Sequence, residues 1–307
     1  MDDRLTKKKG IKQYFMQRPH LIFLMPTTII LAILVIIPTV FLYYISMTDY
    51  ELGYNLLKAE FVGFENYIRL FSGKDAVFWH SVWISLLFML ATTSIELVLG
   101  YLTASLLNLK EFKLKGLVFG WLIIPIAMTP SITGQIWKLI MNAEYGLLNH
   151  ILEIVFGTKI TWLGAEMAFL SIIIIDIWQW TPYMALIIYA GLRSIPAEPY
   201  ESARVDGANI LQKFRYITIP LLKPLLILVV LFRGMDSLKL FDIPYVLTQG
   251  GPGNATELMS LHIFRLGFAQ TGFIGRAAAM SVVLLLTITF LSQFILKYFR
   301  NERGRAQ

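Results

Sequence analysis

Residues 194–224 read SIPAEPYESARVDGANILQKFRYITIPLLKP and lie between two strongly apolar segments. The stretch is polar, and its signals predict two short helices. Pro199 suits the first turn of a helix, where a missing N–H costs nothing, and Gly207 suits a helix end that needs a left-handed residue. Asn209 with Gln212 three residues later predicts a capping box for the second helix. We expect such a structured segment to be presented to a partner protein.

The same stretch resembles the EAA signature of permease subunits in binding-protein-dependent ABC importers. The family pattern E-A-A-x-x-D-G-A, followed after a gap by P, is matched by residues 201–208 (ESARVDGA) and Pro220. Ser202 replaces the first alanine, and Pro199 stands where an apolar residue is more usual. Together with residues 245–252 (YVLTQGGP), the wider pattern over residues 21–300 is similar to the maltose/trehalose-type sugar permeases.

The composition places the chain in a lipid bilayer. Of its 307 residues 56% are hydrophobic and only 15% charged, and the mean hydropathy is +0.63. The absence of cysteine excludes disulfides and thiolate metal sites. The net charge of +7 does not indicate nucleic-acid binding, because the distribution of the charges along the chain follows the membrane topology. A basic start precedes an apolar run too long for a secretory signal, so we expect an uncleaved first span.

Six apolar segments are long enough to cross a bilayer, which needs about 20 residues each. We expect an all-α integral membrane protein with a cytoplasmic segment 1–20, a permease domain 21–300 and a tail 301–307. Its coupling loop, 193–223, lies between the fourth and fifth spans. Prolines should kink the first span and bend the third. The predicted spans are 21–47, 82–107, 117–137, 167–192, 220–247 and 277–296.

The distribution of Lys and Arg predicts the orientation. Alternate segments hold six, three, five and four of these residues: 1–20, 108–116, 193–223 and 297–307. The intervening segments hold three, one and two: 48–81, 141–166 and 248–276. We therefore expect a multi-pass protein of the bacterial cytoplasmic (inner) membrane, with both termini and the coupling loop in the cytoplasm. The first outer loop, 49–79, should carry a small amphipathic helix.

The resemblance assigns the coupling loop to a nucleotide-binding partner. In the family, the acid at the position of Glu201 meets an arginine in a groove of that subunit. Ala203, Asp206 and Gly207 shape the same contact, since small residues allow close approach. The alternative is that Glu201 is merely solvated and Asp206 caps its own helix.

Polar residues at membrane depth form the second candidate site, because they are costly there and default to functional roles. Their helical spacing places them on two stripes. An aromatic surface with acid, hydroxyl and guanidinium groups suits a ring-shaped, mostly neutral ligand. By resemblance these positions, with Gln179, line the sugar site of maltose-type permeases. The stripes comprise Asp176, Trp180 and Tyr183 in the fourth span, and Arg233, Asp236, Ser237 and Leu240 in the fifth.

Structural roles are open for the same residues. Arg233 and Asp236 could simply pair with each other, and Asp176 could be a structural hydrogen-bond acceptor. Glu96, the only charge of the second span, could anchor that span through an interhelical hydrogen bond. Further alternatives are packing roles for Trp178 and Trp180, and a place at the pathway mouth or against the binding protein for Lys239 and Asp242.

The chain has no enzyme signature. It contains neither G-x-x-x-x-G-K-[ST] nor H-E-x-x-H, and its four histidines are scattered, so no metal site is expected. The resemblance implies that ATP and Mg bind partner subunits and that this chain binds no cofactor. The implied partners are a second, different permease, two cytoplasmic ATPase subunits, an external solute-binding protein and a di- or oligosaccharide.

Three other functions stay open on the sequence. The cargo could be charged, such as glycerol phosphate or an acidic saccharide. An ion-coupled secondary transporter could use Glu96, Asp176 and Asp236 as a relay, although such proteins usually show inverted repeats and none is evident. A pure scaffold is disfavoured by the charges inside the membrane.

Overall fold

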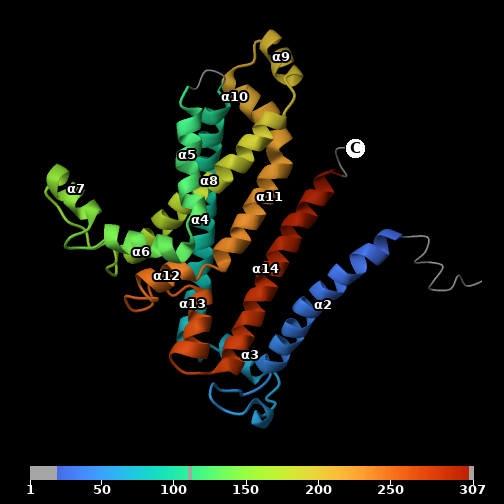
Figure 1. The fold of residues 1–307 in the computed structure, drawn as a ribbon, viewed down its shortest axis with the longest axis vertical. Coiled ribbons are helices and arrows are strands. Elements are labelled where there is room, and N and C mark those ends of the chain that lie inside the picture. The colour runs from blue at the N-terminus through green and yellow to red at the C-terminus, as the bar shows by residue number, and fades with distance from the viewer. Residues whose placement is uncertain (1–18, 110–112, 304–307) are drawn as a thin grey trace, which may run out of the picture.

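Long apolar helices dominate the structure, a computed structural model that describes residues 19–109 and 113–303 (Figure 1). No β-strand occurs within these ranges. The long helices are α2 (Pro19–Ser46), α4 (Ala76–Asn108), α5 (Lys115–Ala127), α8 (Ala168–Ser194), α11 (Ile219–Leu238) and α14 (Ile274–Arg303). The shorter ones are α3 (Glu65–Phe71), α6 (Pro130–Ile140), α7 (Leu147–Phe156), α9 (Glu198–Val205), α10 (Ile210–Lys213), α12 (Asp242–Leu247) and α13 (Met259–Phe264). Three further single-turn elements are one 3₁₀ turn, η1 (Leu56–Lys58), and two π-helical turns, η2 (Phe214–Thr218) and η3 (Arg265–Ala269).

Five helical segments in the described residues are long and apolar enough to cross a membrane, and a sixth is obtained by counting one bent pair as a span. The bent pair is α5 and α6, which meet at 104°. Met128 and Thr129 between them are extended, and for Thr129 the reason is that Pro130 disfavours helical backbone in the residue before it. The predicted all-α membrane fold is confirmed, and its third span is a broken one.

The fifth predicted span is also interrupted. Helix α11 ends at Leu238, and α12 begins after three intervening residues and packs against α6. Gly134 allows this contact, since a Cβ there would lie 3.1 Å from the Cβ of Val246. The Ser131 hydroxyl donates to an oxygen of Asp242 at 2.7 Å. The two broken spans therefore meet each other, which the sequence did not predict.

Helices α4, α8 and α11 form the centre of the bundle, and small residues bring them close together. A Cβ on Gly100 of α4 would lie 2.8 Å from the Cβ of Met184 on α8. Ala104, one turn further along α4, is fully buried. Gly191 of α8 leaves similar room for Leu225 of α11. Gly100 and Ala104 therefore give α4 a small-residue face against which α8 packs closely.

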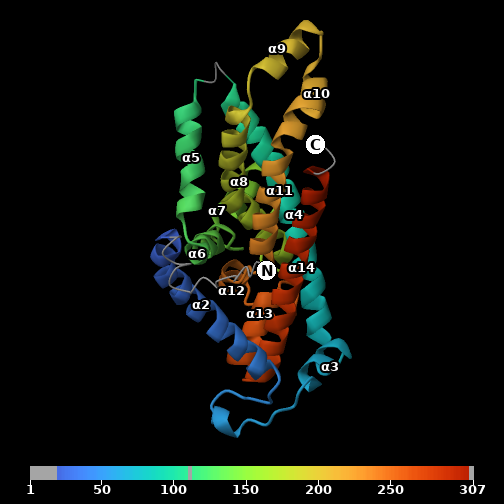
Figure 2. The same ribbon diagram turned by 90° about the vertical axis from the view of Figure 1, so that its right-hand side faces the viewer.

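Two groups of connecting segments lie at opposite ends of the molecule, while α6, α7 and α12 lie between these ends (Figure 1). Helices α9 and α10 lie at one end with the close of α4 and the start of α5, whereas α3 and the loop after α2 lie at the other (Figures 1 and 2). Helix α2 packs against α14 and diverges from the bundle toward its own start (Figure 1). This arrangement has the alternation of ends that six spans require.

Candidate functional site

The coupling segment folds as two short helices with the predicted end signals. Pro199 lies in the first turn of α9, and Gly207 follows that helix with φ of 72°. Asn209 and Gln212 form both hydrogen bonds of a capping box, each 2.8 Å long, at the start of α10. All three predictions are confirmed. The Tyr200 hydroxyl also bonds that of Thr218 at 2.9 Å, which fixes α9 to the helix that continues into the membrane.

The candidate coupling residues lie on an exposed surface. Glu201, Asp206 and Gly207 are exposed, and Ala203 is half-buried. Three apolar side chains share this end of the molecule and are 89%, 87% and 71% exposed: Val205, Ile210 and Leu211. A capped segment that presents both an acid and bare apolar side chains has the character of a docking surface.

Arg233 is the centre of the second candidate site and is almost fully buried. Its Nε donates to Glu96 Oε2 at 2.7 Å, and its Nη2 donates to Glu96 Oε1 at 2.9 Å. The same Nη2 donates to Asp176 Oδ2. Glu96 and Asp176 are both fully buried, so the triad Glu96–Arg233–Asp176 joins α4, α11 and α8 inside the bundle.

Asp236, Trp180 and Tyr183 lie around this triad. Asp236 Oδ2 is 3.7 Å from Arg233 Nη1, and its side chain is 51% exposed. The Trp180 ring lies over the guanidinium, with 5.2 Å from Cζ to the ring centroid, and meets the Tyr183 ring edge-on at 5.9 Å. The structure thus gathers both predicted stripes, but Asp236 faces outward while Arg233 and Asp176 face inward.

Gln179 and Ser237 donate hydrogen bonds to backbone carbonyl groups of the protein. Gln179 Nε2 donates to the Met128 carbonyl at 3.0 Å, so it satisfies a backbone group at the break between α5 and α6. The Ser237 hydroxyl donates to the Arg233 carbonyl at 3.0 Å and lies 3.5 Å from the hydroxyl of Thr92. Both side chains are buried beside the triad. Their assignment to a ligand stays a prediction.

Glu96 is the principal partner of Arg233, and sequence spacing pointed instead to Asp236. The alternative of an interhelical contact for Glu96 is confirmed, and it is a bidentate ion pair. The signal was present in the sequence, because Glu96 is a lone charge in an apolar span. Spacing along one helix could not select a partner 137 positions away.

Several polar atoms of this site lack a hydrogen-bond partner although they are buried. Two are donors, Arg233 Nη1 and Trp180 Nε1, and two are acceptors, Asp176 Oδ1 and Gln179 Oε1. A buried polar group without a partner costs roughly 1–3 kcal/mol. The site therefore holds unused donors and acceptors next to an aromatic ring.

A third polar cluster lies at the end of the molecule opposite α9, beneath residues 245–252. His262 contacts Glu257 Oε1 at 2.8 Å and Asp75 Oδ2 at 3.2 Å, and Arg265 pairs with the other oxygen of Glu257. The hydrogen bond from His262, with the helix-capping amides of residues 77 and 78, lowers the pKa of Asp75 below its ordinary value of 3.8, although partial burial opposes the shift. Within the described residues no cluster suits a metal ion.

Residues 96–301 match the model of a protein family described as the inner membrane component of binding-protein-dependent transport systems. The chain belongs to this family. The permease is 35% identical over 306 residues to the trehalose/maltose transport system permease protein MalF of Thermococcus litoralis, with 99% of each chain covered. It is also 35% identical to the sulfoquinovosyl glycerol transport system permease protein SmoG of Agrobacterium fabrum. That match covers 92% of this chain and 90% of the relative.

A solved structure shares the fold. The permease superposes on a chain of a bacterial alginate ABC transporter, crystallised with a periplasmic protein that holds an alginate pentasaccharide, with a TM-score of 0.79. The identity is 19%, and the match covers 93% of the permease and 95% of the other chain. The resemblance inferred from residues 201–208 is confirmed at the level of the family.

Proposed function

We propose that the permease is a transmembrane subunit of an ATP-driven importer and forms half of a translocation pathway for a neutral di- or oligosaccharide. A second, different permease would supply the other half. Two cytoplasmic ATPase subunits would hold the ATP and Mg, and an external binding protein would deliver the sugar. One observation carries the proposal. The exposed coupling segment connects α8 to α11, and these same two helices hold the buried polar site.

The coupling segment would transmit the ATPase motion through Glu201. Its carboxylate stands on a short helix that is tied to the membrane-entering helix by the Tyr200–Thr218 contact, and the next helix, α10, begins with a capping box. Rigid attachment matters because a loose lever would absorb a displacement and not pass it on. The exposed Val205 and Ile210 would bury apolar surface in the ATPase groove, while Glu201 pairs with a basic residue there.

Charge reversal on α9 tests this role. We expect Glu201→Arg to leave membrane insertion intact but to abolish sugar uptake driven by ATP hydrolysis in the reconstituted complex. Glu198→Arg is the matched control, because it makes the same change on an exposed residue of the same helix outside the signature. Normal uptake by Glu201→Arg, or equal loss in the two variants, would refute the assignment.

The polar site supports a neutral, polyhydroxylated cargo. Each sugar hydroxyl both donates and accepts, which matches the unpaired donors and acceptors of Arg233, Trp180, Asp176 and Gln179. The Trp180 ring offers a stacking surface. Because these atoms are buried, the cargo would reach them in a state in which the helices have moved apart.

A charged cargo is less well supported than the sequence suggested. Arg233 kept that alternative open, but three carboxylates surround its guanidinium: Glu96, Asp176 and Asp236. An anion entering here would meet excess negative charge. In the reconstituted complex with its binding protein, we expect maltose, trehalose or maltotriose to stimulate ATP hydrolysis, and glycerol 3-phosphate to have no effect. Stimulation by glycerol 3-phosphate alone would contradict the neutral-cargo proposal.

An ion relay through Glu96, Asp176 and Asp236 would instead move solute on an ion gradient. Two of these carboxylates are held by Arg233, which leaves them poorly placed to exchange ions. Uptake by vesicles that contain the permease without any ATPase subunit would support the relay and contradict our proposal.

A further inference from the structure

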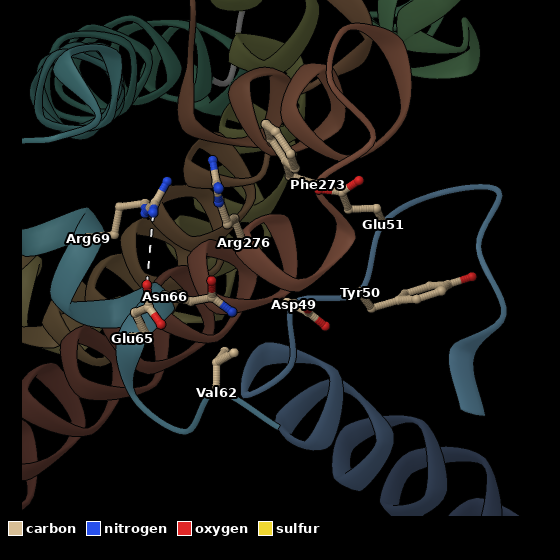
Figure 3. Close-up of a pocket in the computed structure, with 9 residues that line it drawn as sticks. All are labelled: Asp49, Tyr50, Glu51, Val62, Glu65, Asn66, Arg69, Phe273 and Arg276. Atoms are coloured by element: carbon tan, nitrogen blue, oxygen red, sulfur yellow. Dashed lines mark ion pairs between the residues drawn. The ribbon is translucent and has the colours of Figure 1, made fainter. Parts of the chain in front are cut away.

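A mixed-charge cavity lies among the loop after α2, the helix α3 and the start of α14 (Figure 3). Its volume is about 90 Å³, and it adjoins a second cavity of about 290 Å³ that shares Asp49, Tyr50 and Glu51. Carboxylates of Asp49, Glu51 and Glu65 and guanidinium groups of Arg69 and Arg276 line the first cavity. The walls thus offer both signs of charge within a small volume.

Backbone hydrogen bonds and close packing build the walls. The loop after α2 is joined to the start of α14, where Gly275 N donates to the Tyr50 carbonyl at 2.9 Å. A Cβ on Gly275 would lie 2.1 Å from the Thr48 carbonyl oxygen, so only glycine permits this approach. Asn66 Nδ2 donates to the carbonyls of Ser46 and Thr48 at 3.0 and 2.8 Å, which ties α3 to the same loop.

Arg276 is the unused cation of the cavity. Its guanidinium lies over the Phe273 ring at 3.9 Å, and it forms no ion pair with any described residue. Arg69 has a single long contact to Glu65, at 3.9 Å. Figure 3 shows the heads of Arg69 and Arg276 directed to the same side of the cavity. Both can therefore donate hydrogen bonds to an anionic oxygen without breaking a strong internal bond.

The surroundings place this cavity at a membrane surface. It lies where the apolar helices α2 and α14 meet the outer loop. Phe64, which precedes α3, and Ile68 and Phe71 on it have helical spacing and are 66%, 64% and 53% exposed, on a different face from Glu65 and Arg69. A short helix with bare aromatic side chains beside transmembrane helices is typical of the interface between acyl chains and headgroups.

We propose that the cavity binds the headgroup of a zwitterionic phospholipid, phosphatidylethanolamine. The phosphate would lie against Arg276 and Arg69, and the ammonium would face the carboxylates of Glu51 and Asp49. The acyl chains would follow the apolar stripe of α3. An anionic lipid would satisfy the arginines but leave the carboxylates repelled. The inference depends on the membrane-spanning fold and is independent of the proposed cargo.

The test uses the permease purified in its membrane complex, depleted of lipid and titrated with single lipids in detergent, with bound lipid counted by native mass spectrometry. We expect phosphatidylethanolamine to bind about tenfold more tightly than phosphatidylglycerol. Arg276→Gln and Arg69→Gln should each weaken the binding of both lipids, because both lipids carry the phosphate that the two guanidinium groups contact. Lys74→Gln should leave both affinities unchanged, because this exposed lysine near α3 does not line the cavity.

A second variant separates lost binding from damage to the fold. Glu51→Gln keeps both arginines, so it should still bind lipid and should bring phosphatidylglycerol close to phosphatidylethanolamine in affinity. Equal binding of the two lipids by the unaltered protein, or unchanged affinity for both lipids in Arg276→Gln, would overturn the proposal. Binding of soluble O-phosphoethanolamine as tightly as the lipid would also overturn it, since the acyl contacts would then contribute nothing.

Discussion

Arg233 shows how one residue can organise three helices. The guanidinium is planar and offers donors in a fixed fork, so it can bind both oxygens of Glu96 while a remaining N–H reaches Asp176. A lysine could not make this bidentate contact. Inside the membrane the ions have no water to return to, so the geometry of the triad determines how well α4, α8 and α11 stay together.

Two alanine substitutions compare how much individual carboxylates around Arg233 contribute to the free energy of unfolding. Glu96→Ala leaves Arg233 short of a buried carboxylate, and breaking a buried pair in this way costs about 3–5 kcal/mol in the free energy of unfolding. Asp236→Ala removes a half-exposed carboxylate 3.7 Å away and should cost less than about 1 kcal/mol. Unfolding in mixed micelles provides the measurement. Similar losses in both variants would mean that the contact to Glu96 is not the dominant one.

Acid should loosen the end of the molecule that holds Asp75. Because the pKa of Asp75 is depressed in the fold, its carboxylate stabilises the protein fully above its ordinary value of 3.8, and this contribution is lost as the pH falls below that value. We expect Asp75→Asn to be less stable than the native protein at neutral pH and to lose less stability between about pH 5 and pH 3. Thermal unfolding across this range tests it. Glu144→Gln, on a different loop, should keep the native pH profile.

At the scale of single residues, the sequence identified which charges matter but not how they pair. Asp176, Trp180 and Tyr183 lie together as their helical spacing predicted. Glu96 and Arg233 meet across two helices, and only the rotation of each helix in the bundle determines that contact. Such rotations depend on packing over whole helix faces, which a single sequence does not display.

Among the elements, α4 and α8 are held at unusually short range by Gly100. A methyl group there would lie 2.8 Å from Met184 Cβ and 3.2 Å from the Ala185 nitrogen, so the helices must separate. We expect Gly100→Ala to lower stability by about 1–3 kcal/mol. Gly120→Ala is the control, because a Cβ on this residue of α5 meets nothing within 4 Å. Equal stability of the two variants would show that the bundle can adjust freely.

Helices that lie in long apolar runs could be predicted, and the interrupted ones could not be predicted in full. Prolines announced a bend in the third span, but the 104° turn depends on α6 finding α12 as a partner. The break between α11 and α12 has no proline or glycine at residues 239–241 to announce it. Helix α7 was likewise absent from the prediction, because its apolar run is too short to stand out as a span.

On the scale of the whole molecule, both ends can be labelled independently because the chain contains no cysteine. Val205→Cys lies at the coupling end and Tyr54→Cys at the opposite end, and both native side chains are well exposed. We expect a membrane-impermeant maleimide added to intact cells to label position 54 alone. Position 205 should become reactive only after the membrane is opened and the ATPase subunits are removed. The reverse pattern would invert the topology and exclude coupling to a cytoplasmic ATPase.

The meeting of α6 with α12 has a consequence for how the gene can vary. A helix turns by about 100° for each residue, so one inserted or deleted residue between positions 239 and 241 would swing Val246 away from the hollow at Gly134. The Ser131–Asp242 contact would be lost in the same step. Residues in this linker should therefore be replaceable one for one, while its length is held constant through evolution by two helices that never cross the membrane on their own.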